Sequence, residues 1–208
     1  MDIATLLNPS STVLLVIDKQ AGYFDPALVT QRNRSLPDDA AVVLARMDDF
    51  IEEARTFGVE VVWTQMVEDL EMSPAHIAQI MSGDPDGAQS ITKLGDSSFE
   101  IYGRVRPLAT EKVFTKFYYD AFAHTGLAEY LHAKNIQTVI LVGGYANRCV
   151  LSSAVGANGN NMVCVVARDL VMNQLKASHE LPALYDVVNA IFGVAIPAAD
   201  IRAVWKNN

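Results

Sequence analysis

Residues 137–158 read QTVILVGGYANRCVLSSAVGAN and combine an apolar run, a glycine pair and a cysteine. The apolar run at 138–142 is rich in β-branched residues, and Gly143-Gly144 is expected to break it. Beyond Cys149, apolar residues recur at helical spacing. The pattern predicts a strand, a sharp turn and the start of a helix, with Cys149 at that start.

A cysteine in this position is a candidate nucleophile. The free N–H groups and the dipole of a helix N-terminus stabilise a thiolate, and glycine lets backbone N–H groups face a reacting atom. Free cysteines are also commonly small buried residues without a chemical role. The stretch by itself leaves both interpretations of Cys149 open.

Composition limits the class of protein. The 208 residues predict one domain over 1–208, and the net charge of −8 without a basic run argues against binding to nucleic acid or a membrane surface. We find neither signal-peptide features at the start nor an apolar run long enough to span a membrane. The only cysteines, Cys149 and Cys164, have no CxxC spacing, so we expect a reduced, cytoplasmic protein without disulfides.

Strand and helix patterns alternate along the chain. Strands are expected at residues 12–17, 59–64, 112–116, 138–142, 162–166 and 192–194, and helices at 38–57, 74–81, 125–134, 178–191 and 197–205. This alternation predicts a three-layer α/β/α fold: a mainly parallel sheet of five to six strands with helices on both faces. The polar segment 67–99 is expected to be a lid or a subunit contact, over this subunit's site or a neighbour's.

Three polar residues follow the ends of different predicted strands. They are Asp18, Lys116 and Cys149, and the carboxyl ends of parallel strands share the edge where open α/β folds bind ligands. Asp18 would take the proton of the thiol, and Lys116 would keep the carboxylate charged and steady a developing anion. Taken singly, Asp18 is also typical of a cap or turn, and Lys116 of a surface lysine.

Three motifs around these residues resemble one family. They are LLVIDKQAGYF at 14–24, FTKFYYDAF at 114–122 and VGGYANRCV at 142–150. In this order they are similar to the isochorismatase-like cysteine hydrolases, which include nicotinamidases, N-carbamoylsarcosine amidases, ureidoacrylate and biuret hydrolases, and isochorismatases. The resemblance runs from about residue 11 to about residue 194.

The resemblance implies a set of catalytic parts. It implies a triad of Asp18, Lys116 and Cys149, and a non-proline cis peptide bond at Gly144–Tyr145. It also implies an oxyanion hole formed by the N–H groups of Tyr145 and Cys149. Self-association as a dimer or tetramer is a further expectation from the family.

Departures from the family pattern narrow the reaction. Nicotinamidases carry Asp and His metal ligands after the second strand, but residues 61–70 read VVWTQMVEDL, so we expect no metal and no other cofactor. Some isochorismatases lack the cysteine, so its presence favours acyl transfer. The expected function is cleavage of a C–N bond of a small carboxamide or a ureido or carbamoyl compound through a Cys149 thioester. Vinyl-ether hydrolysis and a non-catalytic scaffold are the alternatives.

The small-molecule substrate is expected to meet aromatic side chains and one arginine. Phe24, Trp63, Tyr118 and Tyr145 lie near the expected carboxyl edge, where they would suit a flat or apolar amide, although such residues are equally typical of a core. Arg148 precedes the candidate nucleophile and would bind a substrate carboxylate bidentately, or would be an exposed arginine at a helix end.

Overall fold

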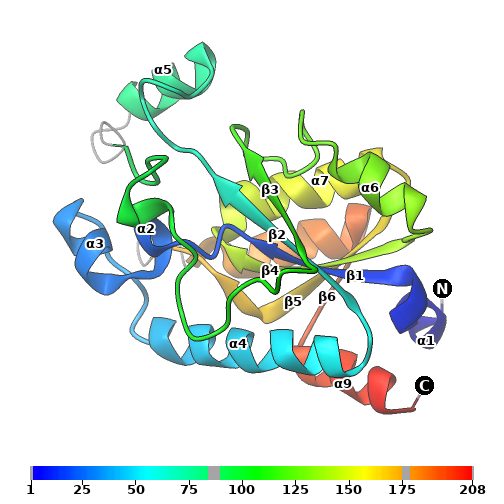
Figure 1. Ribbon diagram of the computed structural model, residues 1–208. Coiled ribbons are helices and arrows are strands. Elements are labelled where there is room, and N and C mark those ends of the chain that lie inside the picture. The colour runs from blue at the N-terminus through cyan, green and yellow to red at the C-terminus, as the bar shows by residue number, and fades with distance from the viewer. Residues whose placement is uncertain (1, 84–89, 175–178, 208) are drawn as a thin grey trace.

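The computed structural model describes residues 2–83, 90–174 and 179–207, and a six-stranded sheet runs through their centre (Figure 1). All neighbouring strands are parallel, in the order β3-β2-β1-β4-β5-β6. The strands are β1 (Thr12–Ile17), β2 (Glu60–Met66), β3 (Lys112–Lys116), β4 (Thr138–Gly144), β5 (Val163–Met172) and β6 (Gly193–Ile196).

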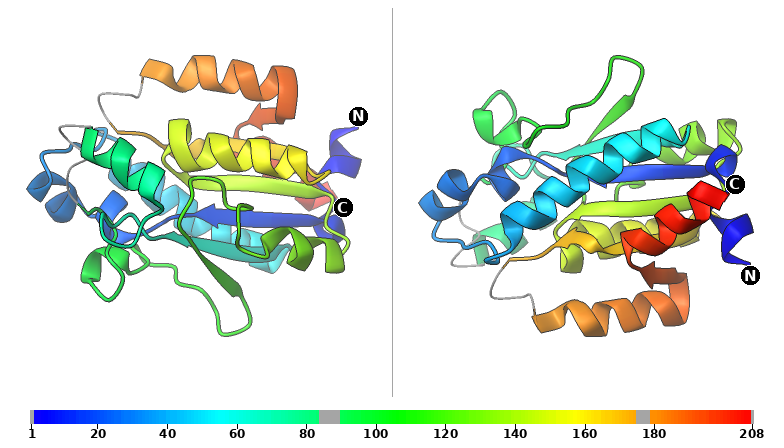
Figure 2. Two further views of the ribbon diagram at one scale, coloured as in Figure 1. Left: turned by 90° about the horizontal axis from the view of Figure 1, so that it is seen from above. Right: turned by 90° about the horizontal axis from the view of Figure 1, so that it is seen from below.

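Helices cover both faces of the sheet (Figures 1 and 2). On one face lie α4 (Ala40–Thr56) and α9 (Ala198–Asn207), and on the other lie α6 (Leu127–Ala133), α7 (Leu151–Gly159) and α8 (Leu181–Val187). The side chains of β1 alternate between two apolar clusters, with Leu14 and Val16 in one and Val13, Leu15 and Ile17 in the other. Burial on both sides explains the uninterrupted apolar run, and the three-layer prediction is confirmed.

The glycine pair does not end its strand. β4 continues through Gly144, and its register with β5 shifts, so that Leu141 pairs with Val166 while Gly143 pairs with Val171. Gly143 has a φ of 112°, and a Cβ there would lie 2.1 Å from the carbonyl oxygen of Ile17 on β1. Glycine is therefore needed at residue 143 for the close approach of β4 to β1. Beyond the shift in register, β4 and β5 continue past their expected ends.

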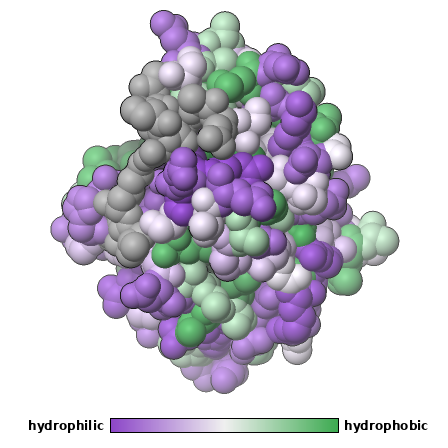
Figure 3. Space-filling model, turned by 90° about the vertical axis from the view of Figure 1, so that its left-hand side faces the viewer, coloured by the Kyte–Doolittle hydropathy of each residue, from purple (hydrophilic) through white to green (hydrophobic). Residues whose placement is uncertain are grey.

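The carboxyl ends of β1, β3 and β4 meet at one edge of the sheet, and several short segments gather there (Figure 1). They are α2 (Ala21–Phe24), α3 (Pro26–Gln31), α5 (Ala75–Gly83) and the turn η2 (Ser97–Phe99). Isolated bridges between Glu68 and Thr92 and between Gln20 and Ile101 join the connection after β2 to this edge. Figure 3 looks onto this end, where hydrophilic side chains gather near the middle of the face.

Among the described residues, no helix is both long and apolar enough to cross a membrane.

Candidate active site

The structure brings the three strand-end residues into direct contact. The Nζ atom of Lys116 lies 2.8 Å from Oδ2 of Asp18 and 3.2 Å from Sγ of Cys149. Asp18 and Lys116 are at most 1% exposed, and Cys149 is 4% exposed. A carboxylate, an ammonium group and a thiol therefore share one buried cluster at the carboxyl edge of the sheet.

A threonine on the neighbouring strand holds the carboxylate of Asp18. The hydroxyl of Thr64 donates to Oδ1 of Asp18 at 2.6 Å, and the N–H of Asp18 donates to Oγ1 and to the carbonyl oxygen of Thr64 at 3.2 Å each. Asp18 has a φ of 49°, a left-handed conformation that aspartate tolerates better than most residues. The sequence analysis missed Thr64, although its place near the end of the second strand was a usable signal.

Lys116 is positioned by the chain that follows it. The carbonyl oxygens of Tyr118 and Tyr119 accept hydrogen bonds from its Nζ atom at 3.0 and 3.2 Å. Burial alone lowers the pKa of Lys116, but the neighbouring Asp18 and Cys149 together raise it above its ordinary value. Lys116 therefore stays a cation, as its expected role requires.

Cys149 lies in η3 (Ala146–Val150), a π-helical turn between β4 and α7. Burial raises its pKa well above the ordinary value; Lys116 opposes this shift, and the Asp18 and Glu68 carboxylates add to it. Loss of hydration therefore opposes the thiolate that a helix start and the neighbouring cation favour. Asp18 and Cys149 both contact the Nζ atom of Lys116, so Asp18 is the candidate base beside the thiol.

Two of the expected pocket aromatics lie beside the end of β4. The peptide bond between Gly144 and Tyr145 is cis. The hydroxyl of Tyr145 donates to the carbonyl oxygen of Tyr23 at 3.1 Å, and the two rings meet edge-on with centroids 5.3 Å apart. The ring of Phe24 lies against Gly144, 3.3 Å from where a Cβ would stand. Phe24 and Tyr145 are buried, so they form a packed wall beside the nucleophile's turn.

The structure does not bring Trp63 to the site. Its side chain is 0% exposed and belongs to the core on the α4 side, where Nε1 donates to Glu111 at 2.7 Å. Successive side chains of a strand point to opposite faces, so Trp63 points away from the face that carries Cys149. The expected contact of Trp63 with substrate is therefore replaced by a structural role.

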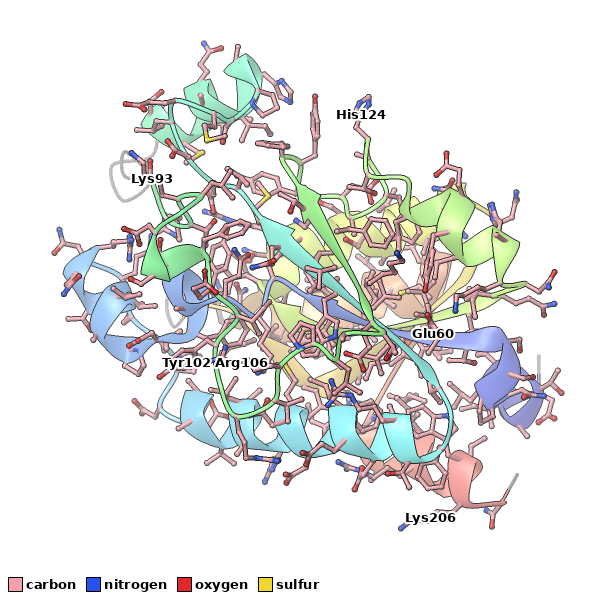
Figure 4. All side chains as sticks on the ribbon, in the orientation of Figure 1. Glu60, Lys93, Tyr102, Arg106, His124 and Lys206 are labelled. Carbon is pink, nitrogen blue, oxygen red and sulfur yellow. The ribbon has the colours of Figure 1, made fainter. Side chains whose placement is uncertain are left out.

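Tyr118 lies at the rim of the same edge. Its half-buried ring stands between two histidines, with centroids 5.8 Å from His76 of α5 and 5.0 Å from His124. Figure 4 shows His124 at the outer end of this region, pointing away from the sheet. Tyr118 therefore joins the Lys116 segment to α5 and belongs to the outer part of the site.

Arg148 points toward a second carboxylate. Its Nη1 atom lies 3.5 Å from Oε1 of Glu68, and its guanidinium group lies over the ring of Tyr119 at 6.0 Å. Glu68 in turn accepts a hydrogen bond from the hydroxyl of Tyr23 at 2.7 Å. The sequence analysis missed Glu68, because Glu68 lies two residues beyond the end of β2 and is not the residue that directly follows a strand. It also missed the contact of Glu68 with Tyr23.

A thiol and a carboxylate that both contact one ammonium group at the carboxyl edge of a parallel sheet are the parts of a cysteine hydrolase. The family model of the Isochorismatase domain matches residues 12–193. The chain therefore belongs to the isochorismatase family, and it is a hydrolase.

Two named relatives agree with this membership, and a solved structure shares the fold. The chain is 30% identical over 184 residues to maleamate amidohydrolase of Pseudomonas putida, covering 84% of this chain and 78% of that protein. It is 25% identical over 162 residues to ureidoacrylate amidohydrolase RutB of Methylobacterium radiotolerans, covering 71% and 61%. A cysteine hydrolase from Pseudomonas syringae pv. phaseolicola has the same fold, with a TM-score of 0.82, 17% identity and coverage of 96% and 94%.

Proposed function

We propose that this protein is a metal-independent amidohydrolase that cleaves a C–N bond of a small carboxamide, ureido or carbamoyl compound through a thioester on Cys149. One observation carries the proposal: Lys116 contacts both Asp18 and Cys149 in a buried cluster. The cluster supplies a nucleophile and a proton acceptor, each within hydrogen-bond distance of the same positive charge.

Acylation begins at the protonated thiol. Asp18 takes the proton of Cys149 as the sulfur attacks the carbonyl carbon. Collapse of the tetrahedral intermediate breaks the C–N bond, and Asp18 gives its proton to the leaving nitrogen. Ammonia or an amine departs, and the acyl group remains on sulfur.

Deacylation repeats these steps with water. Asp18 takes a proton from the water molecule that attacks the thioester, and the proton returns to the sulfur as the acid product leaves. Throughout both halves Lys116 keeps its charge beside the carboxylate and the sulfur, where it lowers the energy of the negative charge that develops there.

The oxyanion of each tetrahedral intermediate needs hydrogen-bond donors. We assign this role to the backbone N–H groups of Tyr145, which directly precedes the turn η3, and of Cys149 within that turn. Losing one such donor in other acyl-transfer enzymes costs roughly 10²–10³-fold in rate. The packing of Tyr145 against Tyr23 supports the role, because it fixes the backbone at the start of the turn.

Metal independence rests on the donors around the cluster. The described parts of the chain contain no group of three His, Cys, Asp or Glu side chains placed to hold a metal ion. The carboxylate after β2 that lies nearest the site, Glu68, contacts Tyr23 and Arg148. The names of the relatives, maleamate amidohydrolase and ureidoacrylate amidohydrolase, support amide chemistry as the reaction.

The proposal is tested by ammonia release from a panel of small carboxamides and carbamoyl and ureido acids, with Cys149→Ala and Cys164→Ala compared with the wild type. We expect release that disappears in Cys149→Ala and persists in Cys164→Ala, because Cys164 lies in β5 within the core. Substantial release by Cys149→Ala would refute the thioester. Absence of release from the whole panel would move the assignment to vinyl-ether hydrolysis or a non-catalytic role.

A further inference from the structure

A second buried ion pair lies directly behind the triad. Lys19 follows Asp18 in the chain, and its Nζ atom lies 2.7 Å from Oδ1 of Asp48 on α4. Lys19 is 0% exposed and Asp48 is 3% exposed. Burial lowers the pKa of Lys19, and the neighbouring Asp48 opposes this shift. The proposed chemistry uses neither charge, and a buried ion pair contributes little net stability after its loss of hydration, so the pair needs another explanation.

The residues after the triad carboxylate pair with a strap, residues 100–105, which leads from η2 toward β3 and passes beside α4 (Figure 4). The N–H of Tyr102 donates to the carbonyl oxygen of Lys19 at 2.7 Å. An isolated antiparallel bridge joins Gln20 to Ile101. The place of the strap therefore affects the backbone next to the triad carboxylate.

The buried ion pair binds the backbone of the strap. The Nζ atom of Lys19 donates to the carbonyl oxygens of Tyr102 and Val105, the second at 3.2 Å. Oδ2 of Asp48 accepts a hydrogen bond from the N–H of Arg104 at 2.8 Å. Three backbone groups of the strap thus have their partners in one ion pair, and Lys19 holds the strap through both its side chain and its carbonyl oxygen.

Gly103 lets the strap turn around this pair. Its φ is 96°, and a Cβ there would lie 2.6 Å from Nζ of Lys19 and 3.0 Å from Oδ2 of Asp48. Glycine is therefore required at this position, both for the backbone conformation and for the close approach of the two charged groups.

Asp18 stands between this anchor and the triad. Thr64 holds its N–H and one carboxylate oxygen, and Lys19 fixes the chain that follows it. Asp18 has a φ of 49°, and a left-handed backbone persists in residues other than glycine where the surroundings fix it on both sides. Loss of the anchor at Lys19 should therefore let the carboxylate move away from Lys116.

We propose that Lys19 and Asp48 are positioning residues for Asp18. By binding the strap, they hold the carboxylate of Asp18 where it takes the thiol proton and gives it to the leaving nitrogen. The inference rests on the proposed amidohydrolase function and adds to it a pair of residues outside the triad. A displacement of about 1 Å at a catalytic group costs up to about 10²-fold in rate.

The decisive variant removes both charges. Lys19→Met combined with Asp48→Asn leaves no buried charge without its partner, and the amide oxygen that replaces the carboxylate still accepts from the N–H of Arg104. Lys19→Met alone would leave the carboxylate of Asp48 buried without its cation and is avoided. Asp48→Asn alone keeps two carbonyl acceptors for Nζ, so it is the milder variant and decides the question if the double variant does not fold.

Arg55→Met is the matched control. Arg55 also joins α4 to the connection that contains the strap, but it does so farther from the triad carboxylate. Its Nε atom donates to Glu111 at 2.7 Å, and its Nη2 atom donates to the carbonyl oxygen of Arg106 at 2.8 Å. Loss of this contact tests whether any weakening of the connection affects catalysis.

Two substrates with the same acyl group isolate the action of Asp18. The best amide of the panel needs a proton on its leaving nitrogen, whereas the 4-nitrophenyl ester of the same acid releases a phenolate that needs none. Ammonia release and the absorbance of 4-nitrophenolate give kcat and KM for each. Circular dichroism verifies that each variant is folded, and urea unfolding gives its stability.

For the double variant we expect kcat for the amide to fall by about 10- to 100-fold, with KM within about twofold of the wild type. The amide-to-ester ratio of kcat/KM should fall by about 10-fold, because protonation of the leaving nitrogen suffers most. Asp48→Asn should change the ratio in the same direction by a smaller factor. Arg55→Met should lower the urea midpoint and leave kcat and the ratio unchanged.

A folded double variant with wild-type kcat for the amide, or with equal losses on the amide and the ester, would overturn the inference. Cys149-dependent ammonia release by the wild type would still support the proposed function in that case. If the wild type does not cleave the ester, kcat and KM for the amide decide, and an unchanged kcat overturns the inference. If the wild type releases no ammonia in a Cys149-dependent way, the proposed function fails, and the inference fails with it.

Discussion

The ion pair between Asp18 and Lys116 gives the most quantitative prediction about this site. The charged atoms are 2.8 Å apart and the side chains are fully buried. At an effective dielectric constant of about 20, such a pair attracts by about 6 kcal/mol, which offsets the loss of hydration of both ions. Removing one partner leaves the other charge buried, so each single substitution should destabilise the fold strongly.

The two single substitutions should not be equal. Lys116→Met leaves the Asp18 carboxylate with the hydroxyl of Thr64, whereas Asp18→Asn leaves Lys116 with two carbonyl acceptors. We expect a loss of about 4–5 kcal/mol for Lys116→Met and about 3 kcal/mol for Asp18→Asn. The double variant removes both charges and should cost about 2–3 kcal/mol less than the two losses added together.

Urea unfolding at pH 7, followed by fluorescence and circular dichroism, measures all four proteins. All three variants should also release no ammonia from the best substrate. Single substitutions within about 0.5 kcal/mol of the wild type would contradict the buried pair. A double variant whose loss equals the two single losses would contradict direct coupling between Asp18 and Lys116.

Three further predictions concern the surroundings of the site. Burial raises the pKa of Cys164 to about 12, so the stability gained from its neutral thiol is complete below the unfolded pKa of about 9 and falls as pH rises. Between pH 8 and pH 10, the free energy of unfolding in urea should fall by about 1.4 kcal/mol more for the wild type than for Cys164→Ala. Equal losses in the two proteins would contradict this. Trp63→Phe should lower the free energy of unfolding by about 1–3 kcal/mol, because the hydrogen bond to Glu111 is lost, and should leave kcat/KM unchanged. A raised KM would show that Trp63 contacts the substrate. Treatment with EDTA should leave ammonia release unchanged, whereas a loss that a divalent metal restores would contradict metal independence.

Strand ends explain why much of the architecture could be predicted from the sequence. The run at 12–17 has β-branched and apolar residues throughout and a charged residue after it, and β1 occupies these residues. Alternating strands and helices require a parallel sheet, and a parallel sheet places Asp18, Lys116 and Cys149 at one edge. Spacing along the chain was therefore enough to group these three residues.

The remaining features depend on contacts between strands and on burial. The shifted register between β4 and β5 arises where Gly143 approaches β1, and a pattern within one strand does not reveal such an approach. Glu68 acquires its environment from Tyr23 and Arg148, which are far away in sequence. The position of Trp63, by contrast, follows from alternation along a strand. Thr64 faces Asp18, so the preceding residue, Trp63, points to the opposite face and into the core.

The covalent intermediate gives the most direct measurement of the central claim. The protein is mixed with its best amide substrate, quenched in acid within the first turnovers, and analysed by intact-mass spectrometry and peptide mapping. We expect a mass increase equal to the acyl group, located on Cys149 and absent from Cys149→Ala. Full turnover by Cys149→Ala, with no adduct on the wild type, would contradict the mechanism.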